Sequence, residues 1–172
     1  MTNLAYLSLG SNINPAQNIR RALTMLALKT DLLAVSSFWE TEPFGMTGQS
    51  NFLNGAAVVK TPLSARRLKR TVLHPIERRL GRTQLTRKWA SRTIDLDLIF
   101  FNRDRLRVGP GVIPHPDALR RAFVAIPLAE IAPDYRHPVT GQSLQEIARR
   151  FEAELNSMRR CNDLLNLQKI AF

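Results

Sequence analysis

The chain has 172 residues, 44% of them hydrophobic, which predicts a single globular domain over residues 1–172 with its own buried core. Its one cysteine, Cys161, excludes an intramolecular disulfide and a zinc site of several cysteines, and no apolar run approaches the ~20 residues that span a bilayer, so we expect a cytoplasmic protein without membrane contact. The formal net charge is +11, and residues 66–92 hold ten basic side chains beside one acid, Glu77, which indicates either a polyanionic ligand or a solvated basic face.

The first two thirds of the chain predict the order strand, helix, strand, strand, helix, strand. The expected elements are a strand at 4–9, a helix with Asn14 as N-cap and Pro15 as first residue, strands at 31–41 and 52–60, a helix from Ser64 to Gly81, and a strand within 91–101. This order predicts an α+β fold of the ferredoxin-like split βαβ type, a βαββαβ core whose helices cover one face of an antiparallel sheet.

Loops and additions complete the expected organisation. Residues 42–51 and 82–92 read as loops, and a Gly- and Pro-rich turn region (108–117), an apolar segment (123–132) and an amphipathic helix near 143–155 form C-terminal additions. Pro75 lies inside the second helix, where it lacks a donor and clashes with the preceding turn, so we expect a kink there or a split around His74-Pro75.

The strand "SRTIDLDLIFF" (91–101) carries two carboxylates in a run that is otherwise apolar. Alternation predicts one face with Ile94, Leu96, Leu98 and Phe100, and another with Asp95, Asp97, Ile99 and Phe101. Carboxylates this close disfavour each other's ionisation unless a cation compensates, and oxygen ligands suit Mg²⁺ together with substrate phosphates. With an arginine-rich loop directly upstream, the pattern indicates metal-assisted phosphate transfer; the alternative is a pair of solvent-facing aspartates that bind Arg92 or a neighbour.

Other patterns narrow the chemistry. No G-x-x-x-x-G-K-[ST] phosphate loop is present, and the three histidines are dispersed with no cysteine beside them, which argues against a zinc site. His115 stands between two prolines with Arg120 and Arg121 close behind, so this stiff loop either donates to phosphate oxygens or is polar only because it is exposed.

Five segments in order carry a resemblance to a known family: "SLGSN" (8–12), "SSFWETEPFG" to "QSNFLN" (36–54), "IERRLGR" (76–82), "RKWASRTIDLDLIFF" (87–101) and "IPHPDALRRAFVAIPLAEIAP" (113–133). Together they resemble the 6-hydroxymethyl-7,8-dihydropterin pyrophosphokinases. The resemblance implies a ferredoxin-like fold and, in folate biosynthesis, transfer of the β,γ-pyrophosphoryl group of ATP to the pterin hydroxymethyl oxygen, with release of AMP.

The resemblance also assigns roles to residues of this chain. Asp95 and Asp97 would bind two Mg²⁺ ions and act in catalysis with Arg82 and Arg92. The nucleotide would contact Glu77, Trp89, Leu98, His115 and Arg121. The pterin would stack between Phe52 and Phe123, with Asn54 reading its edge and Thr41 and Phe44 offering backbone contacts. The loops at 42–51 and 82–92 resemble lids, and the implied partners are the two small substrates, for a monomer without nucleic acid.

Departures from the family pattern all touch the nucleotide or lid side: Pro75, Gln84, Ala90-Ser91 and Pro116. A divergent paralogue that uses another pterin or phosphate donor therefore stays open. The alternative of another class is a basic nucleic-acid-binding module of ferredoxin-like fold, which the charge favours. No strand carries the aromatic pattern with which such sheets stack bases, and two aspartates would face the phosphates.

Overall fold

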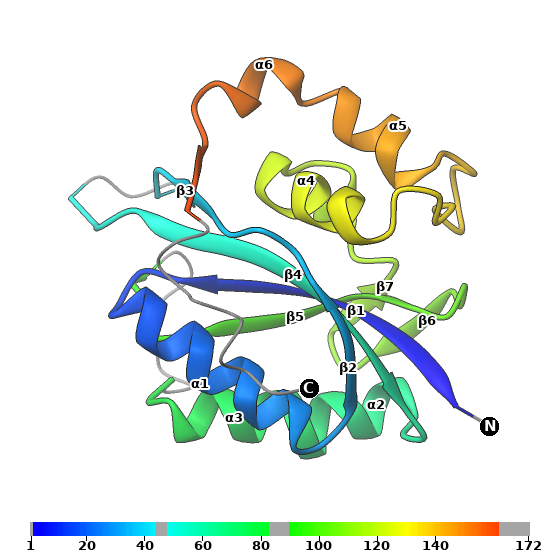
Figure 1. Ribbon diagram of the computed structural model, residues 1–172. Helices are drawn as coiled ribbons and strands as arrows, with labels where there is room; N and C mark the ends of the chain where they lie inside the picture. Colours follow the sequence, from blue (N-terminus) through cyan, green and yellow to red (C-terminus); the bar gives the residue numbers. More distant parts are fainter. Residues whose placement is uncertain (1, 44–47, 83–89, 162–172) are drawn as a thin grey trace.

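The computed structural model describes residues 2–43, 48–82 and 90–161. Within them an antiparallel sheet forms the centre of the molecule, and helices lie on both of its faces (Figure 1). Strands that are hydrogen-bonded side by side run in the order β5-β1-β4-β3-β8, and β2 also pairs with β4. The strand bounds are β1 Asn3–Ser11, β2 Asp31–Val35, β3 Trp39–Thr41, β4 Phe52–Thr61, β5 Asp95–Phe101 and β8 Arg159–Arg160.

The helices form two layers, one on each face of the sheet (Figure 1). One layer consists of α1 (Pro15–Ala27) and a continuous helical segment made of α2 (Ala65–Leu68), the π-helical turn η1 (Lys69–Leu73) and α3 (His74–Arg79). The other consists of α4 (Ala122–Ile131), α5 (Leu144–Arg149) and α6 (Glu152–Leu155), with the 3₁₀ turn η2 (Pro116–Ala118) leading into α4. Each layer has its own apolar core against the sheet, which we call the α1 core and the α4 core.

The predicted ferredoxin-like split βαβ fold is confirmed. β1 lies between β5 and β4, and both β2 and β3 pair with β4, which is the strand arrangement of an antiparallel βαββαβ sheet. The two helices expected from the periodicity cover one face. The C-terminal additions cover part of the other face and leave room there for a cavity.

The prediction of one continuous strand over 31–41 is wrong. β2 pairs with the C-terminal part of β4 (57–60), and β3 pairs with its N-terminal part (52–54). Residues 36–38 interrupt the ladder between them. The Ser36 hydroxyl accepts the Ala56 N–H at 2.8 Å in place of a ladder bond. The Phe38 ring covers Gly55 so closely that a Cβ on Gly55 would lie 2.5 Å from a ring carbon. The chain therefore leaves the strand conformation to bury one aromatic ring against a glycine.

The second predicted helix is split near Pro75, as expected. The α-helix widens to a π-turn over η1, the His74 N–H donates to the Lys69 carbonyl five residues back, and α3 starts with Pro75 in its first turn. An apolar stripe at strict i, i+4 spacing drifts by about 40° per step around an α-helix. The wider π-turn offsets that drift, so Leu68, Val72, Ile76 and Leu80 are all buried in the α1 core.

The start of α1 differs from the expected cap. Asn14 occupies the N-cap position before Pro15, but its φ of 44° is left-handed and its side chain makes no capping hydrogen bond. The Asn18 amide instead donates to the Ile13 carbonyl at 2.7 Å. Proline at the first helical position is confirmed, whereas the side-chain cap is wrong.

The face assignment of β5 is right for its first half only. Pairing with β1 places Leu7 opposite Leu98 but Tyr6 opposite Phe100, so Ile99 is an extra residue in a β-bulge. Beyond the bulge the alternation is reversed: Phe100 packs in the α4 core and Phe101 in the α1 core, opposite to the prediction. Asp95 and Asp97 precede the bulge and share the α4 side of the sheet with Ile99.

The C-terminal additions are more regular than expected. The turn region contains a hairpin of β6 (Leu106–Val108) and β7 (Gly111–Ile113), and the apolar segment forms α4 although Pro127 lies within it. The helix expected near 143–155 is two helices, and β8 pairs with β3 after them. In the described parts of the chain, no helix combines the length and apolarity that crossing a membrane requires.

Candidate active site

A cavity of about 270 Å³ opens between the β4-β1-β5 part of the sheet and α4. Its floor is set by strand register. Asn54, Gly10 and Asp95 lie in one row across β4, β1 and β5, and Ala56, Ser8 and Asp97 form the next row. Side chains of one row that point to the same face become neighbours, so the fold places an amide and two carboxylates on one floor.

Gly10 makes room for the amide end of this floor. A Cβ at Gly10 would lie 2.9 Å from Asn54 Oδ1, closer than Cβ atoms approach other heavy atoms in real structures. Asn54 is 6% exposed and its Nδ2 donates to Thr41 Oγ1 at 2.8 Å on the neighbouring strand β3. The amide is therefore held in one orientation at the cavity wall, with Oδ1 turned toward the open space above Gly10.

Two aromatic rings border the same cavity from different elements. Phe52 begins β4, and Phe123 lies in the first turn of α4. Both are half-buried, although phenylalanine side chains are more often covered completely in the hydrophobic core. They leave apolar ring surface beside the oriented Asn54 amide, which suits a flat ligand with polar edges.

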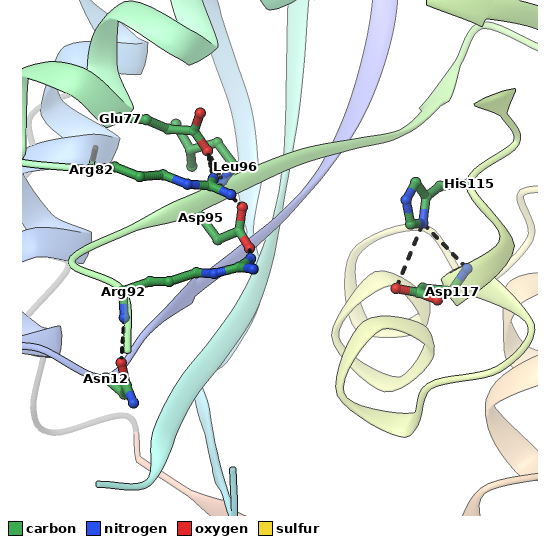
Figure 2. A network of polar contacts seen from close by, with 8 residues as sticks. All are labelled: Asn12, Glu77, Arg82, Arg92, Asp95, Leu96, His115 and Asp117. Atoms are coloured by element: carbon green, nitrogen blue, oxygen red, sulfur yellow. Dashed lines mark hydrogen bonds and ion pairs between the residues drawn. The ribbon is translucent and has the colours of Figure 1, made fainter. Parts of the chain in front are cut away.

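A chain of ion pairs connects the floor to α3 (Figure 2). Arg92 binds one oxygen of the Asp95 carboxylate, and Arg82 binds the other oxygen and also the Glu77 carboxylate. Asp95 is thus held by two guanidinium groups. β5 is an edge strand, and Glu77 Oε1 accepts the Leu96 N–H at 2.9 Å, which satisfies a donor that no strand neighbour reaches.

Burial changes the proton affinities in this network. Burial raises the pKa of the Glu77 carboxyl above its usual value, while the Arg82 guanidinium and the Leu96 N–H oppose that change. Burial also lowers the pKa of Arg92, and the nearby positive charge of Arg82 lowers it further. Both shifts have the same cause: the charged groups are partly removed from water. Electrostatic interactions between them are therefore stronger than at the surface.

Asp97 differs from Asp95 in its surroundings. It lines the cavity, and across residues 2–43, 48–82 and 90–161 no hydrogen-bond donor and no cationic side chain lies within bonding distance of its carboxylate. A half-buried carboxylate without a partner is costly unless a cation reaches it. Asp97 therefore offers oxygen atoms to a ligand of the cavity.

His115 approaches the cavity from the loop before α4 (Figure 2). Its Nδ1 accepts the Asp117 N–H at 3.3 Å, and Asp117 Oδ2 lies 3.8 Å from the same nitrogen. Because Nδ1 accepts, the neutral ring carries its proton on Nε2, which is available as a donor. Asp117 Oδ1 also lies 4.0 Å from Arg121 Nε, so this carboxylate forms a long ion pair with the Arg121 guanidinium.

Asn12, at the end of β1, ties two chain segments together, and this role was not predicted. Its amide donates to the Ser50 carbonyl at 3.2 Å and to Ser91 Oγ at 3.3 Å, and its Oδ1 accepts the Arg92 N–H at 2.7 Å. Ser91 Oγ in turn donates to Gln49 Oε1 at 3.2 Å. The segment "SLGSN" carries part of the resemblance, but these contacts span 38 to 80 residues of sequence and leave no local pattern.

Most of the predicted site residues are brought together. Those that line the cavity are Thr41, Phe52, Asn54, Arg92, Asp95, Asp97, His115 and Phe123. Arg82 and Glu77 lie behind Asp95, Arg121 lines an adjoining cavity of about 190 Å³, and the Leu98 side chain is buried in the α1 core and cannot reach the cavity. Phe44, Gln84 and Trp89 lie outside the described residues. Lining residues that were not predicted include Ser8, Gly10, Glu42 and Asp117.

Comparison with known proteins gives a consistent relationship. Residues 6–133 match the family of 7,8-dihydro-6-hydroxymethylpterin-pyrophosphokinase (HPPK). The 2-amino-4-hydroxy-6-hydroxymethyldihydropteridine pyrophosphokinase of Bacillus subtilis is 41% identical over 134 residues, which cover 76% of this chain and 79% of the relative. The protein of the same name from Haemophilus influenzae is 36% identical over 150 residues, which cover 86% of this chain and 92% of the relative.

Solved structures agree in fold. The wild-type HPPK-DHPS of Plasmodium falciparum superimposes with a TM-score of 0.73 at 14% identity and covers 93% of this chain. The chain spans about half the length of that protein, 48% of it, and at this identity the likeness shows the fold alone. The sequence matches carry the family assignment and confirm the resemblance: the chain belongs to the 7,8-dihydro-6-hydroxymethylpterin-pyrophosphokinase family, whose members are ATP-dependent diphosphotransferases of folate biosynthesis.

Proposed function

We propose that this chain transfers the β,γ-pyrophosphoryl group of ATP to the hydroxymethyl oxygen of 6-hydroxymethyl-7,8-dihydropterin. In the reaction the hydroxymethyl O–H bond breaks, its proton passes to water, and the oxygen forms a bond to the β-phosphorus. The bond between the β-phosphorus and the α,β-bridging oxygen breaks, and AMP leaves with that oxygen. The observation that supports this most strongly is the cavity itself, where an oriented amide and two aromatic rings line the same space as a pair of carboxylates two strands away.

The carboxylates suit magnesium, the metal that the family implies. In the described part of the chain no cluster of three or more His, Cys, Asp or Glu side chains could hold a metal ion by itself. Two carboxylates completed by water and substrate phosphates are the usual Mg²⁺ environment in phosphate-transfer sites, and Asp97 has oxygen atoms free for this purpose. Two Mg²⁺ ions held by Asp95 and Asp97 would offset phosphate charge and polarise the β-phosphorus.

The arginines would serve the phosphates once the nucleotide is present. Arg82 and Arg92 now bind Asp95, whose two oxygen atoms they occupy (Figure 2). If Asp95 takes up a cation, its need for guanidinium partners falls, and the arginines can turn to the ATP phosphates, which they match by geometry and charge. His115, with its proton on Nε2, would donate to a phosphate oxygen from the opposite side of the cavity.

The other wall would hold the pterin. Phe52 and Phe123 offer ring surface to a flat bicyclic ligand, and the Asn54 amide offers one donor and one acceptor to its edge. Neither group takes part in bond making. They would position the hydroxymethyl oxygen relative to the floor carboxylates, and positioning is the main contribution of a protein to phosphoryl transfer. We further propose that the chain acts as a monomer and has no nucleic-acid partner.

The test is a product assay on the purified chain. ATP, Mg²⁺ and 6-hydroxymethyl-7,8-dihydropterin are incubated with wild type, Asp97→Asn, or the matched control Asp31→Asn, an exposed aspartate at the start of β2. We expect AMP and the pterin diphosphate from wild type and from Asp31→Asn, no AMP without the pterin, and a loss of turnover of roughly 10²-fold or more in Asp97→Asn.

Two results would contradict the proposal. Formation of ADP and a pterin monophosphate would show transfer of the γ-phosphoryl group alone. Full activity of Asp97→Asn would show that this carboxylate is not part of the reacting site. A chain that binds the pterin and releases no AMP would be a divergent paralogue with another phosphate donor.

A further inference from the structure

A second large cavity lies on the opposite side of the sheet from the active site. It is a groove of about 540 Å³ between α1 and the η1–α3 segment. It shares no lining residue with the active-site cavity, because the two helices that form it pack on the other face of the sheet. A ligand of this groove would not compete with the substrates.

The floor of the groove is apolar. Val72 and Ile76 form its base, at 4% and 2% exposure, and the half-buried side chains of Met25 and Pro75 cover its sides. Leu28, at the C-terminal end of α1, is 77% exposed and projects beside it. A large apolar side chain so open to water, next to a concave apolar floor, is typical of surfaces that bind a partner.

The rim of the groove is basic. Arg20, Arg21, Lys29 and Arg79 are exposed along it, and none of the described residues that line it is acidic. Within the described residues, Arg21, Lys29 and Arg79 have no carboxylate at ion-pair distance. Glu77, the acid on α3, is buried and points to Arg82 at the edge of β5 instead. Among the described residues, Arg21, Lys29 and Arg79 therefore place positive charge without a paired carboxylate around an apolar centre.

We propose that this groove binds an acidic amphipathic helix of a partner protein. Such a helix would place apolar side chains at i, i+3 or i+4, and i+7 on the floor and its carboxylates against the basic rim, which is the usual mode of helix recognition in a groove. Charge complementarity and the apolar floor both point to this occupant.

Other occupants fit one of the two features only. A nucleic acid would use the basic rim, but its phosphates have no use for an apolar floor. A lipid bilayer is nearly flat at this scale and cannot reach Val72 and Ile76, which lie below the basic rim. A second copy of this strongly basic chain would bring like charge to the rim, which opposes association.

The test uses the full chain and a fluorescein-labelled synthetic peptide of 18 residues, composed of Glu, Leu and Ala with Leu at helical spacing. Its comparison is a scrambled peptide of the same composition. The groove variants are Leu28→Asp, which alters the floor edge, and Arg21→Glu/Arg79→Glu, which reverses the rim charge. The matched control is Arg149→Glu/Arg150→Glu, two exposed arginines at the end of α5 on the other face.

Saturable binding of the amphipathic peptide, measured by anisotropy at 150 mM salt, is expected for wild type and for the α5 control. Each groove variant should weaken binding by roughly tenfold or more, and the scrambled peptide should bind comparably weakly. AMP formation should be unchanged in the groove variants, which shows that they are folded.

Three outcomes would overturn the proposal. Equal binding of the scrambled peptide, or equal losses in the α5 control, would mean that net charge alone attracts the peptide. Tight binding of a single-stranded RNA oligonucleotide that is lost in Arg21→Glu/Arg79→Glu and kept in Leu28→Asp would assign the rim to a polyanion. Self-association of wild type by light scattering that Leu28→Asp abolishes would assign the groove to a second copy of the chain.

Discussion

Asp95 and Asp97 are two residues apart on one strand face, yet they are held differently. Both oxygen atoms of Asp95 bind arginines, whereas Asp97 has no partner among the described side chains. Asp95 is therefore part of an ion-pair network in the ligand-free site, whereas we expect Asp97 to serve a ligand. Substitutions of the two aspartates should therefore affect stability differently, although both should lower activity.

We expect Asp97→Asn to keep or raise the free energy of unfolding, because it removes a half-buried carboxylate without a partner, and to remove most of the activity. Asp95→Asn should also lose activity, and it should lower the free energy of unfolding by about 1–3 kcal/mol, because Arg82 and Arg92 both lose a charged acceptor. Urea denaturation of the two variants measures the difference. A larger loss of stability in Asp97→Asn would contradict this division of roles.

Glu77 gives a dependence of stability on pH. A carboxyl whose pKa is raised by folding binds its proton more tightly in the folded chain. It favours folding fully below the pKa of the unfolded chain, near 4.5, and loses this contribution as the pH rises through the higher folded pKa. Since glutamine does not titrate, the stability of wild type relative to Glu77→Gln should fall from pH 4 upward and then level off. Urea denaturation over that range measures it; a difference that grows with pH would show that Arg82 and the Leu96 N–H outweigh burial.

At the scale of elements, two glycines in neighbouring strands leave room for side chains on opposite faces of the sheet. Gly10 on β1 faces the cavity and leaves room for the Asn54 amide, and Gly55 on β4 faces the α1 core and leaves room for the Phe38 ring. One amide can turn aside, whereas Phe38 is 1% exposed and its ring has no free space.

Alanine at each position should therefore have a different effect. Gly10→Ala should raise the KM for the pterin by roughly tenfold, since the Asn54 amide loses its orientation, with a small change in stability. Gly55→Ala should lower the free energy of unfolding by about 1–3 kcal/mol because it overpacks the core. Steady-state kinetics and urea denaturation of both variants check this; a stable Gly55→Ala or an unchanged KM in Gly10→Ala would refute the respective statement.

The Asn12 contacts connect β1 with the segments at 48–51 and 90–92. Asn12→Ala removes the acceptor of the Arg92 N–H and all amide contacts. We therefore expect the free energy of unfolding to fall by about 1–3 kcal/mol. We also expect a lower kcat, because Arg92 is no longer held in place. Asn12→Asp keeps the acceptor and loses only the amide donors. Its stability and kcat should therefore lie between those of wild type and Asn12→Ala. Equal kinetics of wild type and Asn12→Ala would show that Arg92 is positioned without this contact.

Elements whose pattern is local were predictable from the sequence. The stripe of Leu68, Val72, Ile76 and Leu80 and the alternation around Asp95 and Asp97 repeat over short distances, so they fix a buried helix face and a strand face. The β-bulge at Ile99 was not predictable, because it depends on pairing with Tyr6 and Leu7 more than ninety residues away. The break at 36–38 likewise depends on Gly55 across the sheet. In the site, residue identities were predictable by resemblance, but the double hold of Arg82 and Arg92 on Asp95 required the structure.

At the scale of the whole molecule, the sheet separates the candidate active-site cavity from the groove. The cavity lies on the α4 side and the groove on the α1 side. Figure 1 shows the two helix layers that cover these two faces. Among the arginines of the described residues, Arg92 lines the active-site cavity and Arg20, Arg21 and Arg79 line the groove, so the net charge of +11 is spread well beyond these two sites.

The central claim is that Asp95 and Asp97 hold metal-bound ATP phosphates in the cavity beside the pterin. The most direct test is a crystal structure with Mn²⁺ in place of Mg²⁺, an ATP analogue with a methylene group between the α- and β-phosphorus, and 6-hydroxymethyl-7,8-dihydropterin. We predict anomalous peaks at about 2.0–2.3 Å from oxygen atoms of both carboxylates, with Arg82 or Arg92 moved from Asp95 to a phosphate. Peaks away from these carboxylates, or a nucleotide outside the cavity while Asp95 keeps both arginines, would contradict the account.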